Sequence, residues 1–241
     1  MSSKPAAARH VESLDPYALL EVEQRRAVDF LRGLDEAGWE VPTACPGWRR
    51  REMAAHLAGG EDYNRSTIDG TREQFVAEGV AAGAHDLDSF NDWGVRRRAD
   101  RSAGEVLDEL DQKSAATLRG LRDRDGSDLD TMAGPYSAGL QAFHLAFESA
   151  IHNDDMDVPI DSSDRAARDA WRAAVSRFMI EEAGRPLELE VVDGSTRVRN
   201  TSTGDEAILD DDDLVRAVAG RLRDRAARYP QAVVEVLRGE G

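Results

Sequence analysis

Residues 138–156, AGLQAFHLAFESAIHNDDM, predict a helix on which an apolar row of side chains lies beside an ionisable one. The apolar row consists of Phe143, Phe147 and Ile151. The ionisable row, one residue later, consists of His144, Glu148 and His152. Residues four apart lie on adjacent turns of one helix face. Because the apolar row lies next to it, the ionisable row should face inward or line a cleft. Unpaired ionisable groups are unfavourable in such a place, so the row should have a partner there.

Three further segments have the apolar spacing of amphipathic helices: residues 14–36, a stretch from about Trp48 to Arg65, and residues 102–121. Asp15 and Pro16 are suited to the cap and first turn of the first helix, and Ser102 with Glu105 forms a capping box. Residues 67–90 lack a strong period and predict a long connection with one short helix. Four helices joined by long loops indicate a bundle.

The remaining chain predicts a smaller α+β domain. Residues 158–164 are a linker candidate, and a helix is expected after them. The alternating segment around Asp193-Gly194 then predicts a β-hairpin, and a helix is expected from about Leu214 to Arg228. We therefore predict a mainly α chain, with a four-helix bundle in residues 1–160 and a small α+β domain in residues 161–241.

Composition excludes several classes of function. The 241 residues carry 31 basic and 47 acidic side chains, a net charge of −16 that would repel nucleic acid. Apolar residues make up 41% of the chain, as in globular proteins, but no apolar run approaches the length of a membrane span. The start of the chain lacks the apolar core of a signal peptide, and Cys45 alone cannot form an internal disulfide. We therefore expect a cytoplasmic protein without nucleic-acid or membrane partners.

Glu148 and His152 have a spacing that allows both to bind one divalent metal ion. His56 is the candidate third ligand, because it shares a helix face with Met53, Leu57 and Gly60. Two imidazoles and one carboxylate leave a coordination position open, as in catalytic sites. Zinc suits this donor set, and iron uses the same ligand types. The alternative is that His144 and His152 are ordinary histidines on the helix surface or in a cleft, and that Glu148 pairs with an arginine.

Three stretches carry a family resemblance. They are VPTACPGW at residues 41–48, continuing through REMAAHLAGG at 51–60; NDWGVR at 91–96; and FESAIHNDD at 147–155. Together they resemble the N-terminal domain of the mycothiol-dependent maleylpyruvate isomerases, within the wider group of DinB-like four-helix metalloproteins. Asn153 and Phe147 depart from the family pattern, which more often has arginine and histidine at these positions.

The resemblance implies a DinB-like four-helix bundle in which His56, Glu148 and His152 bind the metal, with zinc expected and nickel or iron as alternatives. It also implies mycothiol as the thiol cofactor and a small electrophilic or unsaturated acid as substrate. His144 matches no family ligand, and we place it among the catalytic residues, beside the ligands or in the substrate pocket. The reaction is either cis-trans isomerisation or S-transfer, and the protein is a monomer or a homodimer.

Two arginine clusters, Cys45 and Trp48 could each have either a functional or a structural role. Arg49–Arg51 and Arg96–Arg98 are candidate partners for carboxylates, although most of these arginines are expected to be solvated. Cys45 and Trp48 are expected to pack the Pro-Gly loop, since no activating base lies near Cys45 in the sequence. Two alternatives to an enzyme stay open: a metal- or thiol-binding sensor or interaction module without turnover, and a purely structural bundle.

Overall fold

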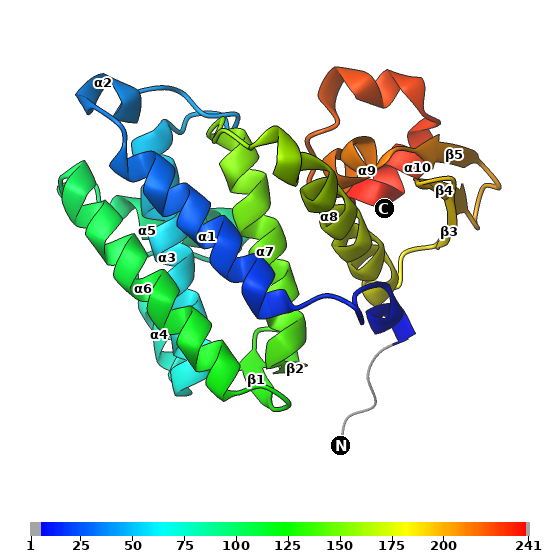
Figure 1. The fold of residues 1–241 in the computed structure, drawn as a ribbon. Helices are drawn as coiled ribbons and strands as arrows, with labels where there is room; N and C mark the ends of the chain where they lie inside the picture. Colours follow the sequence, from blue (N-terminus) through cyan, green and yellow to red (C-terminus); the bar gives the residue numbers. More distant parts are fainter. Residues whose placement is uncertain (1–5, 240–241) are drawn as a thin grey trace. The chain divides into compact units, whose positions relative to one another are not determined.

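A computed structural model describes residues 6–239 of the chain, which form two compact units (Figure 1). One unit is Asp15–Pro159. The other contains the described residues of Met1–Leu14 and Ile160–Gly241. The short 3-10 helix η1 (Ala6–His10) packs against α8 (Ser162–Glu182) in this second unit. The domain boundary near residue 160 stays a prediction, since compact packing alone does not define a functional domain.

The first unit is a four-helix bundle, as the sequence predicts. Its long helices are α1 (Pro16–Arg32), α3 (Arg50–Asp69), α6 (Ala103–Asp123) and α7 (Ala138–Asp155). Helix α1 packs against α6 and α7, and α3 packs against α6 (Figure 1). The chain is therefore mainly α and has the expected DinB-like bundle, followed by a small α+β region.

The predicted helix starts are confirmed by their hydrogen bonds. The side chain of Asp15 accepts from the backbone amides of Tyr17 and Ala18 at 3.0 and 3.1 Å, and Pro16 is the first helical residue. At the start of α6, the Glu105 amide donates to Ser102 Oγ at 3.3 Å, and the Ser102 amide donates to Glu105 Oε2 at 2.9 Å. Local sequence therefore sets where these two helices begin.

The bundle core is formed by apolar side chains that the four helices bury together. The buried members of one cluster are Ala27, Val28, Leu31, Trp39, Met53, Ala54, Ala55, Ala58, Val106, Leu107, Leu110, Met156 and Val158. Trp39 lies in the single-turn helix α2 (Glu36–Trp39). Leu57 and Trp48 pack against this cluster without being fully buried. The core therefore reaches the Pro-Gly loop in front of α3.

The connection from α3 to α6 is more ordered than the sequence predicts. It contains two helices, α4 (Arg72–Ala81) and α5 (Leu87–Arg96), where one short helix in an irregular segment was expected. Helix α5 packs closely on α3, because Gly59 and Gly94 have no side chains at the crossing. This tertiary contact holds α5 against the bundle.

A second difference lies between α6 and α7. Residues 126–137 form a hairpin of β1 (Asp128–Thr131) and β2 (Gly134–Ser137), in which Leu129 pairs with Tyr136. Only four residues per strand leave too little alternation to predict strands from the sequence.

The second unit contains an antiparallel sheet in the order β3 (Leu187–Val192), β4 (Ser195–Asn200) and β5 (Glu206–Leu209). The predicted Asp193-Gly194 hairpin is confirmed: φ is +49° at Asp193 and +77° at Gly194, as a two-residue type I′ turn requires.

The predicted helix from Leu214 to Arg228 is wrong as one element. Helix α9 (Asp211–Val218) ends before Gly220, whose φ is +69°, and the shorter η2 (Arg223–Arg228) follows. Helix α10 (Gln231–Arg238) closes the described chain. Among residues 6–239, no helix combines the length and apolar content that crossing a bilayer would need.

Candidate metal centre

Helices α3 and α7 bring the three predicted ligands together. His56 Nε2 lies 3.2 Å from His152 Nε2, and Glu148 Oε1 lies 3.8 Å from His56 Nε2 and 4.0 Å from His152 Nε2. These three atoms all lie within 4.8 Å of one another. Zinc holds imidazole nitrogen and carboxylate oxygen at about 2.0–2.2 Å, so one ion between the atoms could bind all three after small side-chain adjustments.

The centre is deep on the histidine side and open on the carboxylate side. His56 is 5% exposed. The side chain of Glu148 is 51% exposed, whereas that of His152 is 12% exposed. A ligand can therefore approach from the Glu148 side, while the two imidazoles are held inside the bundle.

The two imidazoles have different affinities for a proton. Burial, together with the charge on His152, lowers the pKa of His56 to about 3. Burial also acts to lower the pKa of His152, but hydrogen bonds with Asp155 and Cys45 and the charge of Glu148 outweigh it and raise this pKa to about 9. His56 is therefore neutral at pH 7, whereas His152 carries a positive charge.

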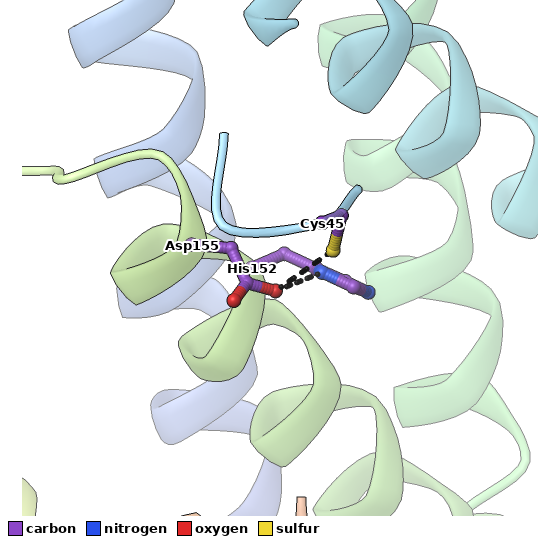
Figure 2. Close-up of side chains that lie close together, drawn as sticks. All are labelled: Cys45, His152 and Asp155. Atoms are coloured by element: carbon purple, nitrogen blue, oxygen red, sulfur yellow. Dashed lines mark hydrogen bonds and ion pairs between the residues drawn. The ribbon is translucent and has the colours of Figure 1, made fainter. Parts of the chain in front are cut away.

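Asp155 orients His152 from the side away from His56. Its Oδ2 lies 3.1 Å from His152 Nδ1, and the carboxylate is buried. Figure 2 shows that Cys45 approaches the same carboxylate, with its Sγ donating to Asp155 Oδ2 at 3.2 Å. A carboxylate on Nδ1 leaves Nε2 for a metal and fixes the ring orientation, an arrangement common around histidine ligands.

The Pro-Gly loop is attached to the end of α7, which brings Cys45 to Asp155. The Ala44 amide donates to the Asp155 carbonyl at 2.9 Å, and Thr43 Oγ1 donates to the Trp48 carbonyl at 2.9 Å. The Trp48 ring lies 4.8 Å from that of His56, centroid to centroid. Trp48 therefore anchors the loop as predicted, and it also covers one ligand.

Cys45, His152 and Asp155 form a second group whose ligand atoms lie within 4.8 Å of one another. This group shares His152 with the first one but uses Nδ1 in place of Nε2. The sequence did not indicate Asp155 as a functional residue, although it lies three residues after His152. A carboxylate at i+3 of a candidate histidine ligand is the local signal that could have identified it.

A cavity of about 430 Å³ opens beside His56 and Glu148. Helices α3, α4, α5 and α7 and the loops next to them provide its walls. Its size is within the range of small-molecule sites. The open side of the candidate metal centre therefore faces a cavity that can hold an organic ligand.

His144 lies apart from this group. Its Nε2 is 3.0 Å from the Tyr136 hydroxyl, and His144 is not among the residues that line the cavity. It precedes Glu148 by one helical turn, as the sequence requires. Its catalytic role stays a prediction, and the contact with Tyr136 gives this histidine a local packing partner.

The candidate arginines divide by environment. Arg49 pairs with Glu40 and Glu52 on the surface. Arg98 is buried and donates to Asp62 and Glu109 at 2.7 Å. Arg97 is the member of these clusters that reaches the cavity lining.

Comparison with known families gives one match. The family described as "Mycothiol maleylpyruvate isomerase N-terminal domain" matches residues 20–157, which is more than half of the chain and includes all three candidate ligands. No curated protein and no solved structure matched the chain significantly.

Proposed function

The chain belongs to the mycothiol maleylpyruvate isomerase N-terminal domain family, and from this premise we propose that it is a metal-dependent enzyme that uses mycothiol. The family relates the domain to a small thiol. The proposed reaction is either cis-trans isomerisation of an unsaturated acid or transfer of the thiol to an electrophile.

The observation that carries the proposal is the convergence of two histidine Nε2 atoms and one carboxylate oxygen beside an open cavity. The donor set fits a divalent ion in two further respects. His152 Nδ1 already has a carboxylate partner in Asp155. His56 Nε2 faces a second imidazole nitrogen at 3.2 Å, and a shared proton or a cation satisfies such a pair.

His56, Glu148 and His152 would hold the ion, which we propose to be zinc, with nickel or iron as the alternatives. When bound, a divalent ion favours the thiolate form of a thiol at neutral pH. Asp155 fixes the ring of His152, and Trp48 covers the ring of His56, so both imidazoles keep their orientation. The cavity then places the second substrate next to the sulfur and limits access of water.

The two proposed reactions share their first step. The thiolate sulfur forms a bond to the β-carbon of a conjugated double bond, and the π electron pair moves toward the neighbouring carbonyl. In an isomerase, the resulting single bond rotates and the carbon–sulfur bond then breaks, which returns the thiolate and the trans double bond. In a transferase, the α-carbon takes up a proton and the carbon–sulfur bond remains.

The deciding experiment measures metal content by elemental mass spectrometry on tag-free protein prepared without chelators. We expect close to one metal per chain in the wild type, and its loss in His56→Ala, Glu148→Ala and His152→Ala. His85→Ala is the matched control, because His85 is an exposed cavity residue outside the ligand group.

The metal-loaded wild type would then be assayed with mycothiol for isomerisation and for S-transfer. Metal without turnover of any electrophile would support the sensor or interaction module. Failure to take up zinc, nickel or iron would reject the metal enzyme and support a structural bundle.

A further inference from the structure

The cavity beside the metal centre has an aromatic wall on the side of α4 and α5. The rings of Phe75 and Trp93 lie 5.3 Å apart, and those of Phe90 and Trp93 lie 5.9 Å apart, measured between centroids. Tyr63 of α3 continues the cluster at 6.1 Å from Phe75. All four rings line the cavity. Aromatic faces and edges of this kind attract apolar and especially aromatic groups.

Apolar side chains also lie exposed at the cavity. Leu87 is 76% exposed and Met132 is 63% exposed, and both line the cavity. The Met132 amide donates to the Tyr63 hydroxyl at 3.1 Å, which connects this residue to the aromatic wall. Exposed apolar groups that gather at a concave site are typical of ligand-binding surfaces. Leu87 and Met132 therefore extend the apolar wall toward the solvent.

The charges around the cavity disfavour a substrate with two carboxylates. Three lining residues are acidic: Asp62, Asp86 and Glu148. Among the described lining residues, Arg97 is the one arginine, and no lysine is present. The guanidinium of Arg97 already lies over the Trp93 ring at 4.7 Å and within 3.7 Å of Asp62. Apart from the proposed metal ion, a dicarboxylate would therefore meet one arginine that is already shared, and the carboxylate of Asp86 would repel it.

We propose that the cavity takes an apolar, predominantly aromatic electrophile that carries at most one anionic group. This inference rests on the proposed thiol chemistry and specifies its second substrate. The aromatic part of this electrophile lies between Trp93 and the exposed side chains of Leu87 and Met132. Its reactive carbon points toward His56 and Glu148. An aromatic enone fits this description. The thiolate sulfur bonds to its β-carbon, the π pair moves to the carbonyl oxygen, and protonation at the α-carbon completes the addition.

Binding can be measured without turnover by using an unreactive probe. The probe is 4-(4-fluorophenyl)butan-2-one, which has the aromatic ring and the ketone but no conjugated double bond. Its binding to the full-length zinc-loaded chain would be followed by fluorine NMR titration. We expect saturable binding that maleate, a small dicarboxylate, does not reverse at equal concentration.

Substitutions of residues that line the cavity test whether the probe binds there. Leu145 of α7 lines the cavity, so Leu145→Trp should fill it and weaken binding at least about tenfold. The double variant Leu87→Ser/Met132→Ser should weaken binding severalfold. The matched control is Val191→Ser/Ile208→Ser, which removes two exposed apolar side chains in the second unit and should leave binding unchanged.

Each outcome decides a different statement. The inference would be overturned if maleate displaced the probe as effectively as the aromatic enone benzylideneacetone does. It would also be overturned if Leu145→Trp bound the probe with wild-type affinity. Zinc content, measured on the same samples, separates the two proposals. Zinc retained without probe binding rejects the apolar substrate and leaves the thiol enzyme intact. If the wild type binds no zinc, both the proposed enzyme and this inference are rejected.

Discussion

His152 Nδ1 lies 3.1 Å from Asp155 Oδ2, so the imidazole that presents Nε2 to His56 is held from behind by a buried carboxylate. This contact predicts that Asp155→Asn weakens zinc binding by about 10–100-fold, because the amide orients the ring poorly and makes it less basic. Competition with a chelator of known affinity measures the change. Asp157→Asn, at an exposed position two residues later, should bind zinc like the wild type. Equal affinities in all three proteins would contradict the role of Asp155.

The pH dependence of metal binding follows from the two histidines. His152 has a pKa raised to about 9, so below that pH the metal must displace its proton, whereas His56, with a pKa of about 3, is already neutral. Affinity should therefore rise by about tenfold per pH unit up to about pH 9 and then level off. Calorimetry in buffers of different ionisation enthalpy should detect about one proton released per metal at pH 7.5. Affinity that is constant between pH 6.5 and 8.5 would be inconsistent with this assignment.

His144→Gln tests the predicted catalytic role. We expect this variant to retain its metal, because His144 contacts Tyr136 and is not a member of the ligand group. A general acid or base contributes about 100-fold or more to the rate, so a catalytic His144 requires a loss of that size in kcat. Tyr136→Phe removes the same hydrogen bond and is the control for packing. A loss below about threefold in His144→Gln would reject the catalytic role.

Two neighbouring glycines of α3 should respond in opposite ways to alanine. A Cβ at Gly59 would lie 3.1 Å from the backbone of Gly94, so Gly59→Ala should destabilise the bundle by about 1–3 kcal/mol. A Cβ at Gly60 meets nothing within 4 Å. Gly60→Ala should therefore stabilise the helix by up to about 1 kcal/mol. Urea unfolding measures the free energy of unfolding of both variants. Equal changes in this free energy would show that α5 can move away from α3.

Adjacent arginines provide a further stability test. Arg98 is buried and joins Asp62 to Glu109, so Arg98→Met leaves these carboxylates without their central partner and should lower the free energy of unfolding by about 3–5 kcal/mol. Arg97 is exposed, and Arg97→Met should lower it by less than about 1 kcal/mol. Thermal and urea unfolding measure both variants. If Arg98→Met and Arg97→Met lowered the free energy of unfolding by similar amounts, a structural role specific to Arg98 would be contradicted.

The sequence alone determined the features that depend on neighbouring positions. Helix periods and caps such as Asp15 and Ser102 are local, so the main helices and the starts of two of them could be predicted. The four-residue step from Glu148 to His152 also fixes their shared face, and this made the pair a candidate before the fold was known.

Only the tertiary structure decided which distant groups meet. Cys45 and Asp155 are separated by 110 positions, yet the loop before α3 is hydrogen-bonded to the end of α7 and brings them together. The aromatic cavity wall likewise depends on α4, whose apolar period is weak, and on α5, which the contact between Gly59 and Gly94 holds against α3. Long-range packing selects such contacts because a local pattern specifies only which face is apolar, and not which partner covers it.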